Sequence, residues 1–404
     1  LRYLQICGRE IENAEHEKTG LASPATSEDA PSKRSGNHYG RLREKPEMNV
    51  TLIVPTMNRP DLLLRLVSYY HSLGFRGKIL IGDSSNADTS AQIAKSLTSY
   101  SDALDCHYYH LPGKSPCAAI NFLNKEITTD YAASIADDDF LVPSGIDNCI
   151  RFLDGHSGYV AAHGISVLIG SRSGDAGVIE SASYNRQPIV EEDTASRRFS
   201  SHFKDYSVSL FSVHRTEIWC KIFGNTLERS ERSECSDRSF CDELLQCGLS
   251  AVYGKIKQID QLYLVRQVHN SRYLLPSSVS WFDWIMKDDW RASYLYFRSH
   301  VAEAISKVDG IPFAQSEQYV DRSFSSYLKK LIATAETKPN RVRELARKSA
   351  HLRAFWHAWR MVSARLQPTR VTLESLQCPT SPYYADFLPV YRAVTKSQPL
   401  SGKA

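Results

Sequence analysis

The stretch Tyr131–Phe140, YAASIADDDF, decides how this chain folds. Its first half is short and apolar, which is the pattern of a buried β-strand. Its second half places Asp137, Asp138 and Asp139 in a row, and burying unpaired carboxylates is costly. We therefore predict that the strand ends here, with the three acids at its C-terminal tip. Pro143 suits the first turn of a following helix, which we expect over 143–152.

The position of the acids indicates what they bind. In an open α/β sheet, ligands bind outside the carboxyl ends of the strands. Carboxylates there suit a divalent cation such as Mg²⁺ or Mn²⁺, which also takes substrate phosphates. The alternative is a solvated acidic turn that caps the next helix. The apolar strand in front of the triplet favours the metal site.

Strands and helices alternate along the chain before this stretch. Val50–Val54 is a β-branched run stopped by Pro55, and apolar residues at helical spacing follow Pro60. This alternation predicts an α/β fold with a mostly parallel sheet flanked by helices. We expect strands at 50–54, 78–82 and 106–109, and helices over 60–70, 91–97 and 115–127.

The chain after the triplet is less regular. A strand at 159–163 leads into 170–206, which mixes Ser, Gly, Arg and acidic residues and is predicted to be a long binding or mobile loop. Its pair Arg197–Arg198 could contact an acidic acceptor or face water, and we expect it to face water. Further on we predict a strand at 207–214, a strand or a hairpin within 251–265, and helices at 216–223 and 239–246.

The last third is predicted to be helical. Apolar residues recur at helical spacing over 282–306, 317–334 and 341–366. Segment 341–366 is strongly basic and carries Trp356 and Trp359. Such a helix can lie on an anionic membrane surface, or it can pack normally with a solvated basic face, and both readings stay open.

Composition excludes several classes of protein. A net charge of +4 over 404 residues gives no reason to expect a nucleic-acid partner, and no apolar run reaches the roughly 18 residues of a membrane span. Nine cysteines with no Cys-x-x-Cys pair and no signal-peptide pattern suggest reduced thiols. We expect a cytoplasmic protein, with peripheral contact at the inner face of the membrane through 341–366. Residues 1–47 are expected to be a disordered or extraneous leader.

Four motifs in order give a family resemblance. They are VTLIVPTMNRP at 50–60, IGDSS at 81–85, GKSPCAAINFLNK at 113–125 and IADDDF at 135–140. Together they resemble a family 2-like glycosyltransferase of the GT-A (Rossmann-like) fold. The resemblance implies a nucleotide-sugar-binding half at 48–164 and an acceptor-side half at 165–275, followed by a helical C-terminal region at 276–404.

The resemblance also implies which residues bind the donor. Asp83 would accept a hydrogen bond from the uracil or ribose. Arg59, Lys114 and Arg266 are cations that can share the charge of the diphosphate. The full set of expected donor-binding residues is Pro55, Thr56, Asn58, Arg59, Asp83, Lys114, Asp137 and Asp138.

Metal ligands and a base follow from the same resemblance. Asp137, Asp139 and His269 would hold Mn²⁺ or Mg²⁺, with Asp139 the most direct ligand. FCDELL at 240–245 is similar to the family's Glu-Asp-x-x-Leu motif, although Cys241 stands where Glu is usual. The general base is therefore left open between Asp242 and Glu243.

These observations predict a metal-dependent, inverting glycosyltransferase. It would move a sugar, with UDP as the expected nucleotide, to a hydroxyl of a glycan or lipid-linked acceptor in surface polysaccharide or glycan synthesis. One alternative is a nucleotidyltransferase, although a Gly-rich phosphate loop is missing near the N-terminus. Another is a non-catalytic scaffold that binds a membrane or a partner through its basic C-terminal helices.

Overall fold

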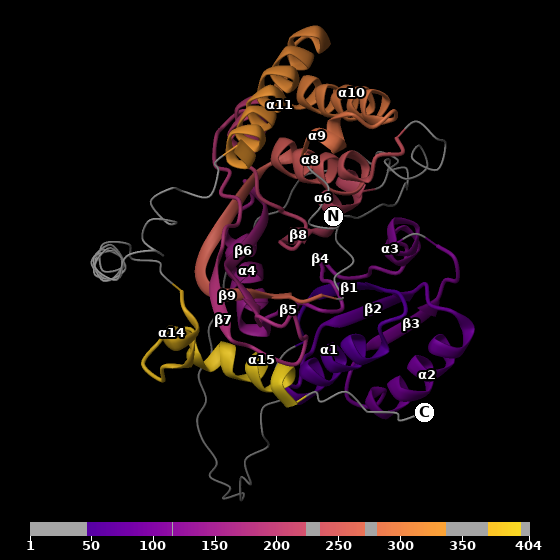
Figure 1. The fold of residues 1–404 in the computed structure, drawn as a ribbon. Coiled ribbons are helices and arrows are strands. Elements are labelled where there is room, and N and C mark those ends of the chain that lie inside the picture. Colours follow the sequence, from indigo (N-terminus) through magenta and orange to yellow (C-terminus); the bar gives the residue numbers. More distant parts are fainter. Residues whose placement is uncertain (1–46, 115, 224–234, 271–280, 337–370, 397–404) are drawn as a thin grey trace, which may run out of the picture.

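The computed structural model describes residues 47–114, 116–223, 235–270, 281–336 and 371–396. They form a nine-stranded mixed sheet with helices on both faces (Figure 1). The strand order is β3-β2-β1-β4-β8-β6-β9-β5, and β7 pairs with β6 outside this path. The expected α/β fold class, with a sheet flanked by helices and further helices at the C-terminal end, is confirmed.

The N-terminal half is the parallel part of the sheet. Its strands are β1 (Val50–Thr56), β2 (Lys78–Asp83), β3 (Cys106–His110) and β4 (Tyr131–Ser134), and its helices are α1 (Pro60–Ser72), α2 (Ala87–Leu97) and α3 (Pro116–Asn124), with a short 3₁₀ turn η1 (Thr98–Tyr100). Thr56 pairs with Asp83, and Ile53 pairs with Ser134. The carboxyl ends of these strands therefore meet at one edge, where the acidic triplet follows β4.

The middle of the chain completes the sheet. It contains β5 (Phe140–Leu141), α4 (Pro143–Gly155), β6 (Tyr159–Gly170), β7 (Ser181–Asn185), α5 (Ala195–Lys204), β8 (Val213–Arg215), α6 (Thr216–Phe223), the π-helical turn η2 (Phe240–Leu244), α8 (Leu245–Tyr253) and β9 (Lys255–Val268).

The long parallel pair β6–β9 carries the end of β9 to the acidic triplet. Its register shifts at bulges near Gly164, where an added Cβ would lie 2.2 Å from the Gln261 carbonyl oxygen. Beyond the bulge, β9 pairs with β5, so that Phe140 lies opposite Val265. Because Phe140 follows Asp139 directly, this pairing brings the triplet beside the C-terminal end of β9.

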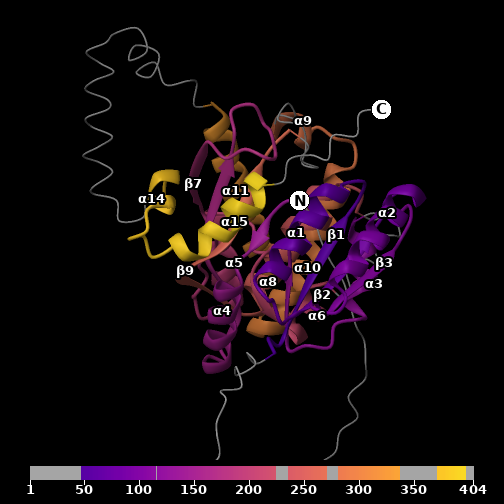
Figure 2. The same cartoon turned by 90° about the horizontal axis from the view of Figure 1, so that it is seen from below.

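The C-terminal helices contact the rest of the protein at two places. α9 (Trp281–Ile285), α10 (Trp290–Asp309) and α11 (Phe313–Glu336) form a layer over α5 and α8, whereas α14 (Leu373–Gln377) and α15 (Tyr384–Lys396) return to the other side, where α15 packs on α1 (Figure 2). Phe387, Val390 and Val394 of α15 are buried, and each such apolar side chain contributes about 1.5–3 kcal/mol. None of the described helices is long and apolar enough to span a membrane.

Most predicted elements are confirmed, with shifts at their ends. The prediction of a loop over 170–206 is wrong, because the segment contains β7 and the buried helix α5. Most of the expected strand at 207–214 is also missing, since only 213–215 pairs with a neighbour. The expected helix over 282–306 is interrupted between α9 and α10. The basic segment 341–366 and residues 1–46 of the leader lie outside the described residues.

Candidate active site

The acidic triplet lies in the turn between β4 and β5, and all three carboxylates are buried. Asp137 is 1% exposed, Asp138 6% and Asp139 2%. Burying three neighbouring carboxylates is unfavourable unless each is paired and hydrogen-bonded. The partners come from β1, from Arg59 just before α1 and from the end of β9, so the fold, and not the local sequence, stabilises the triplet.

Arg59, just before α1, bridges the first two acids. Its Nη2 lies 2.5 Å from Asp137 Oδ1, its Nε 3.2 Å from Asp137 Oδ2, and its Nη1 3.0 Å from Asp138 Oδ2. The hydroxyl of Thr56 donates to Asp137 Oδ2 at 2.7 Å. Burial raises the pKa of Asp137, and the positive charge of Arg59 opposes that rise.

The other two acids contact the end of β9. His269 Nε2 lies 3.2 Å from Asp138 Oδ2. Burial by itself would raise the pKa of Asp138, but the hydrogen bond from His269 and the charge of Arg59 outweigh it and lower that pKa to about 2. Asp139 accepts from Arg266 Nε at 3.1 Å and from the backbone N–H of Gln267 at 2.8 Å. Thus Asp138, and not the expected Asp139, is the acid beside His269.

The residues at this edge are of the right kind for a divalent cation. A carboxylate and an imidazole are ligands that Mn²⁺ accepts, and Nδ1 of His269 is buried without a hydrogen-bond partner. Within the described ranges, however, no group of three or more His, Cys, Asp or Glu side chains is placed to hold a metal ion. Any cation bound here would therefore need further ligands, such as phosphate oxygens of a substrate.

The other predicted donor-binding residues lie at the ends of β1, β2 and β3. Asn58 adopts a left-handed backbone (φ 54°), and its N–H donates to Ser85 Oγ at 2.7 Å. Asp83 is fully buried and accepts from the Ser85 N–H at 2.9 Å and from the Tyr108 hydroxyl at 2.6 Å. Asp83 thus shapes this loop in addition to any role in binding. Pro55 is half-buried beside Thr56, and Lys114 is exposed in the turn after β3.

The two base candidates lie in η2, the π-helical turn at Phe240–Leu244. Such turns occur often at functional sites. Glu243 Oε1 accepts from the Tyr206 hydroxyl at 2.9 Å, which directs this carboxylate to the layer formed by α5 and α11. Asp242 is 5% exposed.

A disulfide lies beside the base candidates. Cys235 and Cys241 are joined, with Cα atoms 6.2 Å apart, which is within the usual range for such a bond. The expectation of reduced thiols is therefore wrong for this pair. The spacing of six residues matches no recognised motif, so this disulfide could not be predicted from the sequence.

Two residues that support the candidate site were not predicted from the sequence. Arg65 of α1 and Gln267 of β9 lie behind the triplet, both buried, and are hydrogen-bonded to each other. The available signal was an arginine at a helical position among buried residues of an amphipathic helix. The expectation that Arg198 faces water is also wrong, because its guanidinium is buried and donates to backbone carbonyls.

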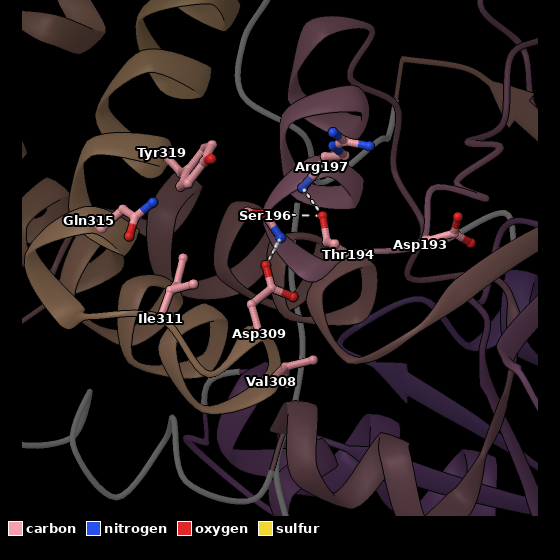
Figure 3. Close-up of a pocket in the computed structure, with 9 residues that line it drawn as sticks. All are labelled: Asp193, Thr194, Ser196, Arg197, Val308, Asp309, Ile311, Gln315 and Tyr319. Atoms are coloured by element: carbon pink, nitrogen blue, oxygen red, sulfur yellow. Dashed lines mark hydrogen bonds between the residues drawn. The ribbon is translucent and has the colours of Figure 1, made fainter.

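A separate cavity of about 570 Å³ lies between the start of α5 and the α10–α11 turn (Figure 3). Asp309 accepts there from the N–H groups of Ala195 and Ser196. Asp193, which lines the cavity, pairs with Lys255 at the start of β9, whereas the triplet lies at the other end of that strand. The cavity is therefore distinct from the acidic site.

Comparisons with known proteins agree with the motifs. The model of Glycosyl transferase family 2 matches residues 51–214, less than half of the chain, and confirms the family resemblance. No curated protein matches the chain.

Solved structures give weaker likenesses. S. aureus TarS 1-349 in complex with UDP-GlcNAc is 15% identical, with a TM-score of 0.45 over 87% of this chain and 91% of that chain. The mannosyltransferase PcManGT from Pyrobaculum calidifontis, in complex with GDP-Man and Mn²⁺, is 12% identical, with a TM-score of 0.36 over 89% of each chain. Likenesses at this level carry no conclusion about the residues of the present site.

Proposed function

We propose that this family 2-like glycosyltransferase moves a sugar from a UDP-linked donor to a hydroxyl of a glycan or lipid-linked acceptor, with inversion and with help from a divalent metal ion. The observation that carries the proposal is the convergence at one edge of the sheet. Thr56, the acidic triplet and the cation Arg59 meet there with Arg266 and His269 at the end of β9. The family match at residues 51–214 supports this assignment.

The residues of this edge have distinct roles in the proposal. Asp138 and His269 would hold the metal ion, because both oxygens of Asp139 accept hydrogen bonds from Arg266 and Gln267. A divalent ion bound there offsets the negative charge of a leaving diphosphate. Arg59 and Arg266 are the protein's own cations beside that position. Each can exchange a carboxylate for a phosphate oxygen through charge-assisted hydrogen bonds.

Asp242 is our proposed general base. A base must lie within hydrogen-bond reach of the acceptor hydroxyl. Asp242 stands where the similar Glu-Asp-x-x-Leu motif of the family has its Asp, and the Tyr206 hydroxyl directs the carboxylate of Glu243 to the helical layer. Direct displacement with the base opposite the leaving group inverts the anomeric centre.

The test is calorimetric titration of UDP, GDP and CDP into the full chain, with Mn²⁺ and with chelator. We expect one nucleotide, UDP, to bind tightly only with metal. Asp138→Ala should abolish this metal-dependent binding of UDP. Asp105→Ala is the matched control, because Asp105 is an exposed acid paired with His107 in front of β3.

Metal-independent binding, or no binding of any nucleotide, would refute the mechanism as proposed. Loss of binding in Asp139→Ala with Asp138→Ala unaffected would refute only the choice of metal ligand. NMR detection of the product anomer then tests inversion.

A further inference from the structure

Arg65 is a buried cation whose guanidinium, within the described residues, is hydrogen-bonded to no acidic side chain. It is 7% exposed, and its guanidinium donates to three uncharged oxygens. These are the carbonyl oxygens of Ala176 at 3.0 Å and Asp138 at 3.3 Å, and Oε1 of Gln267 at 2.7 Å. Its Nε is buried without a hydrogen-bond partner. Its Cζ lies over the ring of Phe140, 5.2 Å from the ring centre.

A charge in this setting is costly. Transfer of a guanidinium from water to neutral acceptors loses hydration that those acceptors only partly replace. Burial accordingly lowers the pKa of Arg65 to about 10, against the opposing attraction of the acids of the triplet. The compensating charge is therefore the triplet itself, which lies on the other side of the Asp138 backbone.

Gln267 links Arg65 to the third acid. Its backbone N–H donates to Asp139 Oδ1 at 2.8 Å, and its side-chain amide donates to the Ala176 carbonyl that Arg65 also contacts. Arg65 and Gln267 thus hold the Asp138 backbone, the Asp139 carboxylate and the turn at Ala176 together. We call these two residues the bracket.

We propose that Arg65 is a positioning residue, which fixes the acidic triplet through the bracket and keeps a positive charge behind it. This inference rests on the proposed function, since it concerns the same site. It predicts that Arg65 acts through the carboxylates and never touches the substrate. Loss of such outer-shell partners typically weakens metal affinity or activity by about 10–100-fold.

Arg198 is a matched control for a purely structural role. It too is buried, at 6% exposed, and in the described part of the chain it donates only to backbone carbonyls, those of Ala251, Val252, Glu192 and Asp193. It lies on α5, near the start of β9 and away from the triplet. Replacing it removes a comparable buried guanidinium without changing the bracket.

The experiment compares Arg65→Met, Arg65→Lys and Arg198→Met in the full chain. Amide hydrogen exchange of the free protein reports on the bracket without any ligand. The probes are the amides of Asp139 and Gln267, which donate to Ala136 O and to Asp139 respectively. We expect Arg65→Met to speed exchange at both about tenfold or more, Arg65→Lys to have a smaller effect, and Arg198→Met to leave both unchanged.

The second readout is titration of UDP into each protein in the presence of Mn²⁺. Arg65→Met should weaken binding about 10–100-fold, with partial rescue in Arg65→Lys, whereas Arg198→Met should stay within about twofold of wild type. If Arg65→Met does not fold, Arg65→Lys against Arg198→Met makes the same comparison.

The outcomes separate the two proposals. Unchanged exchange at both probes, or binding weakened equally by Arg65→Met and Arg198→Met, would overturn the role of Arg65. Absence of nucleotide binding in the wild type would instead overturn the proposed function, and the exchange experiment would still decide whether the bracket holds the triplet.

Discussion

The ion pair between Arg59 and Asp137 gives the sharpest prediction on stability. The Asp137 side chain is 0% exposed and that of Arg59 is 20% exposed, and two hydrogen bonds join them. Arg59→Met would leave the Asp137 carboxylate buried without its main counter-charge. Breaking a buried pair in this way costs about 3–5 kcal/mol, so we expect the free energy of unfolding to fall by that amount.

A double-mutant cycle isolates the pair. Asp137→Asn removes the charge but keeps an oxygen that can accept from Thr56, so Arg59→Met should cost much less in that background. We expect a coupling energy of about 2–3 kcal/mol from urea unfolding of the four proteins without ligand. The cycle also cancels any other contact that Arg59 makes.

An exposed pair provides the comparison. Arg151 and Asp147 lie one turn apart on α4 at 2.5 Å, with side chains 65% and 48% exposed. Such pairs couple by about 0.3–0.5 kcal/mol. A coupling between Arg59 and Asp137 no larger than this would refute the argument that Arg59 balances the buried charge of the triplet.

Two further predictions concern a buried histidine and the base. Burial lowers the pKa of His202 to about 4 from 6.5, so the unfolded chain binds a proton that the folded protein excludes, and stability falls as pH drops from about 6.5 to about 4. In the wild type, the free energy of unfolding should therefore fall by about 2 kcal/mol between pH 7 and pH 5, and His202→Phe should remove this loss. Urea unfolding of both proteins at the two pH values measures it, and an equal pH dependence in both would contradict the prediction. Asp242→Asn should lower the rate of sugar transfer at saturating donor by about 10²–10⁴-fold with nucleotide affinity unchanged. Glu243→Gln should lower that rate less. A larger loss in Glu243→Gln than in Asp242→Asn would make Glu243 the base.

Much of the parallel half was predictable because its signals are local. A β-branched run stopped by Pro55, or an apolar strand followed by three acids, determines an element within a few residues. The edge of the sheet that carries the triplet followed from the same reasoning, since carboxyl ends of parallel strands meet. Within the described residues, the expected cluster of Thr56, Arg59 and the triplet is indeed found at that edge.

The parts that were missed depend on long-range contacts. Helix α5 was predicted to be a loop because its buried face includes Arg198 and His202, whose polarity hides the apolar spacing of Phe199 and Phe203. The guanidinium of Arg198 can be buried there only because carbonyls from α8 lie within reach. Likewise, the choice of Asp138 over Asp139 beside His269 depends on how β5 pairs with β9, which no local pattern encodes.

The charge balance of the site gives a reason to expect donor and metal to bind together. Three carboxylates of the triplet face three nearby guanidinium groups, those of Arg59, Arg65 and Arg266, in the described part of the chain. Arg65 is fixed behind the backbone, so only Arg59 and Arg266 can turn to a phosphate, and each that does so leaves a buried carboxylate less well paired. A diphosphate arriving alone would therefore add negative charge to a site that has no spare cation among these three. A divalent ion that arrives with it restores the balance, and this is why chelator should weaken nucleotide binding rather than merely slow the chemistry.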